Sequence, residues 1–181
     1  MKKLIVTLVS LLGASGAYAD ASYFDMFVGA EGGVSLMSYS NPDEETSSNI
    51  NMLLSAGASM GIKLGSTSNL YRYGFSTLVD GGRSIFPDFD DKHVSNWGAV
   101  IMFDNYIRMQ RSWRRSLIFS GGYGFRDMNS GDLEPVYIAS FAWTERTDAN
   151  LDVVSAVRLF MPDDRDAGID FALRIGLRYN F

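Results

Sequence analysis

Two residues near the middle of the chain have the types and the spacing that hydrolytic chemistry requires. They are His93 and Ser95, in the run His93-Val94-Ser95-Asn96. Residues two apart on a β-strand share one face, so the imidazole could act as a base toward the serine hydroxyl. The chain has one histidine and no cysteine, which excludes thiolate zinc sites, iron–sulfur clusters and any site that needs two imidazoles. We expect no metal or other cofactor, because no phosphate-binding glycine loop or EF-hand spacing occurs.

A second set of polar residues recurs at alternate positions along the chain and carries both signs of charge. Six acids and seven bases lie on the polar face of alternating segments. Near-equal numbers suit charges that pair with one another away from bulk water, so we predict a network of ion pairs rather than a catalytic array. The set is Asp25, Glu31, Lys63, Arg72, Asp80, Asp104, Arg108, Arg126, Asp152, Arg158, Asp170, Arg174 and Arg178.

The segments that hold these residues alternate between apolar and polar side chains with a period of two, which only a β-strand sustains. In the last segment, apolar or aromatic residues occupy every second position from Ile169 to Phe181. In the fourth segment Asn105 falls on the apolar face, which would fit a β-bulge. We predict eight strands, at about 22–40, 50–65, 70–86, 96–110, 114–128, 136–147, 151–161 and 169–181.

The connections between these segments alternate between long acidic ones and short ones. The long connections are 41–49, 87–95, 129–135 and 162–168, and the short ones are 66–69, 111–113 and 148–150. Long loops at one rim and short turns at the other are typical of a bacterial outer-membrane β-barrel. Each long connection also holds one proline, a residue that is excluded from interior ladder positions of a sheet. These prolines are Pro42, Pro87, Pro135 and Pro162.

Glycine indicates which face of the strands points outward. Ten of the 18 glycines lie on the charged face. A face exposed to water, as in a soluble lipocalin-like barrel, has no need of missing side chains, whereas the narrow interior of an eight-stranded barrel does. Aromatic residues gather near the segment ends, where interfacial belts are expected. We predict an all-β fold, an eight-stranded antiparallel up-and-down transmembrane β-barrel with its charged face inside.

The first 19 residues predict a secretory signal peptide. Lys2 and Lys3 form a basic start, an apolar stretch runs from Leu4 to Leu12, and a small-x-small cleavage site ends at Ala19. Residues 20–181 are then expected to form the barrel as a single domain. The net charge of −5 argues against a nucleic-acid partner, because phosphate binding needs clustered lysine and arginine.

The closing segment, IDFALRIGLRYNF, ends on Phe181 with Tyr179 two residues before it. It resembles the C-terminal strand of outer-membrane β-barrel proteins, and the chain from residue 20 onward resembles the small eight-stranded barrels of the OmpA, OmpX and opacity-protein type. The resemblance implies the outer membrane of a Gram-negative bacterium, both termini in the periplasm, and no periplasmic domain. It also implies that the barrel-assembly machinery recognises Tyr179 and Phe181. We expect a monomer that contacts outer-membrane lipid and lipopolysaccharide.

The predicted role is that of a non-enzymatic barrel with a plugged polar lumen, which serves envelope integrity or surface interaction through its acidic loops. The sequence does not identify an extracellular partner. One alternative is a lipid A-modifying acyl hydrolase, because His93, Ser95 and Asn96 resemble the His-x-Ser-Asn motif of the PagL-type lipid A deacylases. That family's motif lies in a late strand, however, whereas His93 follows Pro87 in a mid-chain loop. A second alternative is a narrow channel for small solutes.

One short connection carries a basic and aromatic cluster, Arg111, Arg114 and Arg115 around Trp113. Tryptophan and arginine are enriched where a protein meets lipid headgroups. We predict that this cluster lies at the membrane interface, against anionic headgroups of the inner leaflet.

Overall fold

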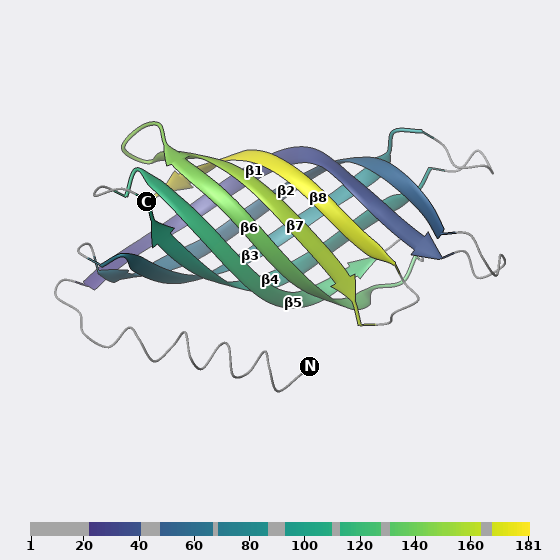
Figure 1. Cartoon of the computed structure of the whole chain (residues 1–181), viewed down its shortest axis with the longest axis horizontal. Coiled ribbons are helices and arrows are strands. Elements are labelled where there is room, and N and C mark those ends of the chain that lie inside the picture. Colours follow the sequence, from purple (N-terminus) through teal and green to yellow (C-terminus); the bar gives the residue numbers. More distant parts are fainter. Residues whose placement is uncertain are drawn as a thin grey trace.

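The computed structural model describes residues 22–40, 48–66, 69–86, 93–109, 113–127, 131–163 and 168–181. The predicted signal peptide and most of the four long connections lie outside the described residues. Eight antiparallel strands close into one up-and-down barrel (Figure 1). They are β1 (Ser22–Ser40), β2 (Ser48–Ser66), β3 (Tyr71–Ser84), β4 (Ser95–Arg108), β5 (Arg115–Asp127), β6 (Glu134–Arg146), β7 (Leu151–Pro162) and β8 (Ile169–Asn180).

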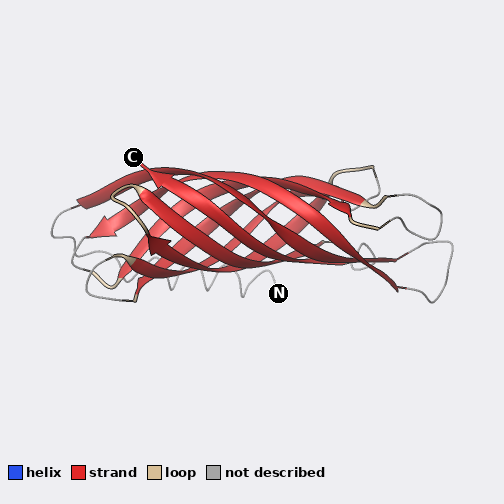
Figure 2. Cartoon of the chain, turned by 90° about the horizontal axis from the view of Figure 1, so that it is seen from above, coloured by secondary structure: helices blue, strands red, loops and turns tan. Residues whose placement is uncertain are grey.

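The predicted fold class is confirmed, and every strand begins and ends within two residues of its predicted range. Figure 2 shows the described part of the chain as strands joined by loops. Among the described residues, no helix has the length and apolarity to span a membrane. The two-residue period was therefore a sufficient signal for the elements themselves.

The strand register runs without interruption around the barrel. Each strand pairs with its neighbour in the sequence, and β1 closes on β8 from Phe27 opposite Asn180 to Ser38 opposite Ile169. Asn105 pairs with Tyr73 on β3 and with Phe119 on β5 in the regular ladder. The possible β-bulge at Asn105 does not occur, because the regular ladder accommodates this amide near the short-turn end of β4 with its Oδ1 buried.

The stagger of the strands sets the width of the barrel. Successive paired residues, followed once around from Asp25, lead back to β1 at Ser35, ten residues further along. With ordinary strand spacing and rise, this stagger corresponds to a strand tilt of about 40° and a backbone radius of about 8 Å. Side chains fill an interior of that size. The residues passed on the way are Lys63, Gly74, Asp104, Ser120, Ser140, Arg158 and Ala172.

Two of the prolines predicted in loops lie in strands instead. Pro135 is the second residue of β6 and Pro162 is the last residue of β7. A proline at the end of a strand removes at most one ladder hydrogen bond, so both are tolerated there. The Pro135 carbonyl still accepts a hydrogen bond from the Asp163 N–H at 2.9 Å. Pro42 and Pro87 lie outside the described residues.

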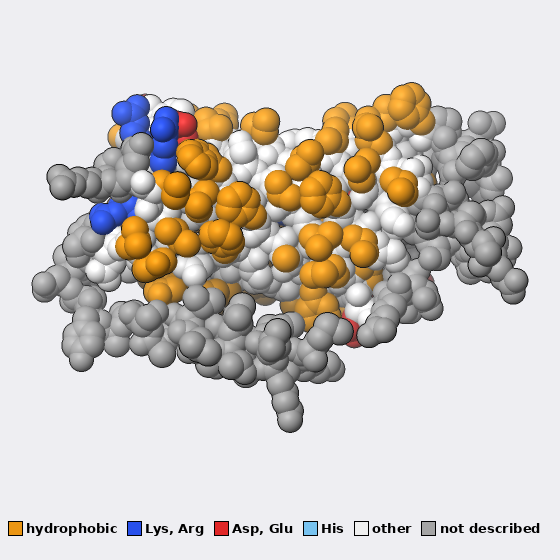
Figure 3. Space-filling view, in the orientation of Figure 1, with side chains coloured by type: hydrophobic (Ala, Val, Ile, Leu, Met, Phe, Trp, Pro, Cys, Tyr) orange, Lys and Arg blue, Asp and Glu red, His pale blue; other side chains and the backbone are white. Residues whose placement is uncertain are grey.

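The outward face is a broad apolar surface. Large side chains such as Phe75, Ile101 and Ile175 are exposed on it, and Ile175 is 68% accessible. Phe24 and Phe181 are exposed near the short-turn rim. Figure 3 shows hydrophobic side chains over the body of the barrel and basic ones gathered at the end with the short turns. This arrangement inverts that of a soluble protein, because the largest apolar residues point away from the interior.

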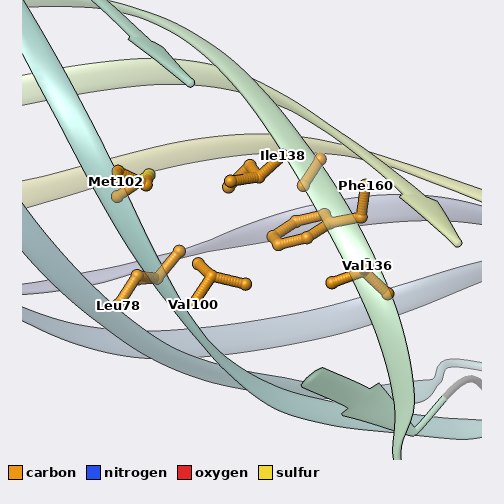
Figure 4. Close-up of a cluster of buried hydrophobic side chains, with 7 residues drawn as sticks. Leu78, Val100, Met102, Val136, Ile138 and Phe160 are labelled. Atoms are coloured by element: carbon orange, nitrogen blue, oxygen red, sulfur yellow. The ribbon is translucent and has the colours of Figure 1, made fainter. Parts of the chain in front are cut away.

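The interior holds an apolar core as well as charges. Close to the long-loop half of the barrel, seven buried side chains form one cluster, drawn in Figure 4: Leu78, Val100, Met102, Val136, Ile138, Phe160 and Ala172. A second cluster lies toward the short turns and contains Tyr106, Ile118, Ala142, Val154 and Ala156. The two-residue period does not predict these clusters, because β4, β6 and β7 carry apolar residues on both faces and alternation is weak there.

Candidate functional site

Arg126 is the centre of the charged network in the long-loop half of the lumen. Its side chain is fully buried, donates one hydrogen bond to the Asp80 carboxylate, and donates another from Nη2 to Asp170 Oδ2 at 2.8 Å. The guanidinium carbon also lies 4.0 Å from the centre of the Phe160 ring. One cation therefore joins β3, β5, β7 and β8 across the barrel.

Two further arginines extend this network to β1. Arg174 Nη2 lies 3.1 Å from Asp80 Oδ2, and Arg174 Nε lies 3.9 Å from Glu31 Oε1. Arg158 donates to both oxygens of Glu31, the longer of the two bonds running 2.7 Å from Nη2 to Oε2. Three arginines thus alternate with three carboxylates, so this half of the network is balanced in charge.

Lys63 is the centre of the network in the short-turn half. Its ammonium lies 3.7 Å from a carboxylate oxygen of Asp25 and 3.7 Å from one of Asp152, and it donates a hydrogen bond to the Asn180 side chain. Arg146 Nε donates to Asp152 Oδ1 at 3.0 Å. Arg146 is the last residue of β6 and is in phase with the inward Ala142 and Thr144, so its side chain reaches the lumen mouth from the rim. The predicted charged set omitted it although the two-residue period includes it.

Aromatic rings sandwich the cations at the short-turn mouth. The Arg72 guanidinium carbon lies 3.5 Å from the Tyr23 ring centre and 3.8 Å from the Trp113 ring centre. Arg178 lies 3.9 Å from the Phe27 ring centre. Such stacking stabilises a cation by about 0.5–2 kcal/mol, depending on how far water is excluded.

Trp113 therefore does not lie where the sequence analysis placed it. The ring packs over the lumen mouth on Arg72 and on the second apolar cluster, so it does not face headgroups as predicted. For the Trp113 ring, contact with the Arg72 cation and burial against apolar side chains are more favourable than a position among lipid headgroups. Arg115 does point outward, where it pairs with Glu145 at 2.7 Å, and Arg111 lies outside the described residues.

All thirteen residues of the predicted charged set face the lumen. Eleven are buried, and Glu31 and Arg108 are partly buried. The tyrosine hydroxyl of Tyr106 donates to Asp104 Oδ2 at 3.2 Å, and Asn96 Nδ2 donates to Asp170 Oδ2 at 2.8 Å. The neutral partners were missed because formal charge alone defined the predicted set.

The inward glycines hold the strands close together where the sheet bends. A Cβ added to Gly122 would approach the Ile101 carbonyl oxygen more closely than the 3.0 Å that real Cβ atoms respect, and one on Gly33 would do the same at Leu173. The outward neighbour Gly121 has no such conflict, since the nearest atom lies 4.0 Å away. These glycines were predicted to make room in the lumen, and in the structure they also permit tight curvature of the barrel wall.

The predicted catalytic residues lie at the long-loop rim. His93 is exposed just before β4, with Nδ1 3.3 Å from Ser84 Oγ and 3.1 Å from the Ser84 carbonyl oxygen. Ser84 Oγ also accepts a hydrogen bond from the Val94 N–H at 3.0 Å. Ser95 is the exposed first residue of β4, opposite Arg83. The contacts of His93 with Ser84 tie the end of β3 to the start of β4.

The predicted assembly residues lie together at the other rim. The rings of Tyr179 and Phe181 are 5.1 Å apart and both are exposed. The Phe181 N–H donates to the Met26 carbonyl at 2.9 Å, which extends the seam between β8 and β1 by one residue. Within the described ranges, no group of three or more histidine, aspartate or glutamate side chains could hold a metal ion.

Comparisons with known proteins identify the fold. No family model matches the chain, and no curated protein matches it in sequence. Neisserial surface protein A, NspA, is similar in structure, with a TM-score of 0.58 and 10% identity over 90% of this chain and 100% of that one. The translocator domain of the autotransporter NalP from Neisseria meningitidis has a TM-score of 0.37 and 8% identity, over 99% of this chain and 96% of that one. The outer membrane protease OmpT from Escherichia coli has a TM-score of 0.34 and 11% identity, over 90% of this chain and 97% of that one. At such identities the likeness to NspA shows the fold alone, and the two lower scores carry no argument.

Proposed function

We propose that this chain is a non-enzymatic outer-membrane β-barrel that serves envelope integrity or surface interaction through its loops, with a lumen closed by its own side chains. The outward apolar surface supports the membrane location, because a barrel that exposes Phe75, Ile101 and Ile175 in mid-strand requires lipid around it. Outer-membrane lipid and lipopolysaccharide are then its immediate partners. The chain acts as a monomer and has no nucleic-acid partner.

The orientation follows from the two kinds of connection. Short turns of outer-membrane barrels face the periplasm and long loops face outward. The first residue of β1 and the last residue of β8 both lie at the short-turn end (Figure 1). In the proposed orientation both termini are therefore periplasmic, and Tyr179 and Phe181 lie where the barrel-assembly machinery would engage the last strand.

The closed lumen is the observation that carries the proposed function. The network around Arg126 crosses the interior, and the apolar cluster that includes Phe160 and Val100 packs beside it. An eight-stranded barrel has an interior just wide enough for side chains to fill. A continuous path for solutes would require these groups to separate.

Planar-bilayer recording tests this proposal against the narrow-channel alternative. The purified, folded protein is expected to give no steady conductance at any applied voltage, while a porin preparation in the same membrane shows open channels. Stable single-channel steps from the pure protein would overturn the closed-lumen proposal. A folded form whose mobility on an SDS gel does not change on boiling would contradict the barrel itself.

The second candidate function is lipid A acyl hydrolysis. The observation in its favour is that a ring nitrogen of His93 lies within hydrogen-bond range of a serine hydroxyl, 3.3 Å from Ser84 Oγ. Mass spectrometry of lipid A from cells that express the wild type, His93→Ala, Ser84→Ala or Ser95→Ala distinguishes the two functions. The non-enzymatic proposal expects identical acyl patterns in all four strains. Loss of an acyl chain that depends on His93 would establish the hydrolase.

A further inference from the structure

The short-turn half of the lumen has more cations than anions. In contrast to the three arginines and three carboxylates of the long-loop half, five basic side chains here face three acidic ones. Three of the bases, Lys63, Arg72 and Arg178, are buried, and like charges gathered away from bulk water are unfavourable unless opposite charge offsets them. The bases are Lys63, Arg72, Arg108, Arg146 and Arg178, and the acids are Asp25, Asp104 and Asp152.

Hydrogen-bond donors in the same region lack acceptors. Trp113 Nε1 and both Nε and Nη1 of Arg178 are buried and have no hydrogen-bond partner among the described residues. Arg178 as a whole is only 8% exposed. Buried acceptors without partners occur elsewhere in the described part of the chain, at Asn96, Asn105, Glu134 and Asp170, but none lies on a residue that lines the cavity at this mouth. Unpartnered arginine N–H groups also occur in the long-loop half, on Arg126, Arg158 and Arg174. The missing partners here are all acceptors.

A small cavity brings these groups together. It has a volume of about 20 Å³, and its lining holds four bases, one acid and four other side chains: Lys63, Arg72, Arg146, Arg178, Asp152, Tyr106, Trp113, Ser116 and Thr144. A cavity of this size holds about one water-sized body. A larger hollow of about 360 Å³ at the rim shares Trp113 and Arg146 with it, so the cavity lies next to the open short-turn end.

We propose that the inner cavity binds a small monovalent anion of chloride size. A single anion accepts hydrogen bonds in all directions and offsets the excess of four bases over one acid in the lining, whereas a neutral water molecule leaves that excess in place. The indole N–H of Trp113 and the two free N–H groups of Arg178 are the expected donors, and Lys63 supplies charge. The site goes beyond the proposed envelope function and does not depend on which compartment this end of the barrel faces.

Chloride titration of the folded full-length mature chain in detergent micelles tests the site. At constant ionic strength, replacing sodium gluconate with sodium chloride should raise the midpoint of thermal unfolding along a saturating curve, because a ligand that binds only the folded state stabilises it by mass action. Gluconate is too large for a cavity of about 20 Å³ and serves as the inert anion. Identical midpoints in the two salts would show that the cavity holds water alone and would overturn the proposal.

A single-tryptophan protein gives a readout that does not depend on stability. Trp97 and Trp143 are exposed on the outward face, so Trp97→Phe with Trp143→Phe leaves Trp113 as the only emitter. Chloride should then change the Trp113 emission with the same half-saturation as the thermal titration. An emission that changes linearly with chloride, or not at all, contradicts a site beside this indole.

Three variants separate the site from a general salt effect. Arg178→Gln should weaken the apparent chloride affinity at least tenfold, and Trp113→Phe should weaken it while keeping an aromatic ring on Arg72. Arg158→Gln removes an equally buried arginine from the balanced half, so it should lower stability and leave the chloride affinity unchanged. Equal chloride dependence in all three variants would assign the effect to salt and not to this cavity.

Discussion

Removing the Arg126 guanidinium should destabilise the barrel far more than removing an outward arginine. In Arg126→Met, Asp170 keeps only the neutral Asn96 amide as a hydrogen-bond donor among the described residues, while Asp80 keeps Arg174. Charges about 4 Å apart at an effective dielectric constant of about 20 interact by about 4 kcal/mol. Breaking a buried pair by removing one partner costs about 3–5 kcal/mol, so we expect a loss in that range in the free energy of unfolding.

The matched control is the Arg115 pair with Glu145. It has the same chemistry and a 2.7 Å contact, but its side chains are 42% and 39% exposed. Solvent screening limits an exposed pair to about 0–1 kcal/mol, which is the expected loss in Arg115→Met. Urea unfolding of the folded protein in phospholipid vesicles, followed by tryptophan fluorescence, measures both losses.

A double variant separates the lost attraction between Arg126 and Asp170 from the cost of leaving the Asp170 carboxylate buried without a cation. Arg126→Met with Asp170→Asn removes both members of the pair, and the methionine side chain can still pack on Phe160. We expect it to recover most of the stability lost in Arg126→Met, since no unpaired carboxylate remains on β8. Two results would contradict this expectation. One is a loss of less than about 1 kcal/mol in the free energy of unfolding of Arg126→Met. The other is a double variant whose loss equals the sum of the losses of Arg126→Met and Asp170→Asn.

Three further predictions test the wall, the outer surface and the seam of the barrel. Gly122→Ala should cost about 1–3 kcal/mol or prevent refolding, whereas Gly121→Ala should change stability by less than about 0.5 kcal/mol; the heat-modifiable fraction after refolding compares them. Ile175→Arg, in the middle of the lipid-facing surface, should lower the free energy of unfolding by about 2–4 kcal/mol, and Leu151→Arg at the rim by about 0–1 kcal/mol. Urea titration measures both losses, and equal losses would contradict the proposed membrane span. Deletion of Phe181 should lower the amount of folded barrel in cells more than it lowers the stability of the refolded protein, as measured by fractionation and by unfolding.

The elements were predictable because the two-residue period is local information. The predictable part of the lumen was equally local: a charged residue in phase with its strand, such as Asp80 or Arg174, faces inward. Which carboxylate Arg126 meets was not predictable, because its partners on β3 and β8 are set by the stagger of the whole barrel. Sequence alone does not specify that stagger.

Other features were missed where local patterns are ambiguous. Val100 and Ile101 are both apolar, so the period could not show that Val100 packs inside while Ile101 faces out. Trp113 lies in a turn, where no period applies, and the cation at Arg72 decides its orientation. Arg146 was omitted although it is in phase with Ala142 and Thr144 on the inward face of β6, so the period could have identified it. Trp113 and Arg146 are also among the side chains that line the proposed anion site.

The seam between β1 and β8 constrains the order in which this protein can fold. Phe27 on the first strand pairs with Asn180 at the end of the last, so closure must await nearly the entire chain. Until then every partly assembled sheet has two open edges, and open edges are where strands pair with other chains. Contacts so distant in sequence also form slowly. The chain therefore passes its most aggregation-prone stage just before the final hydrogen bonds form, which is the step where an assembly factor would have the greatest effect.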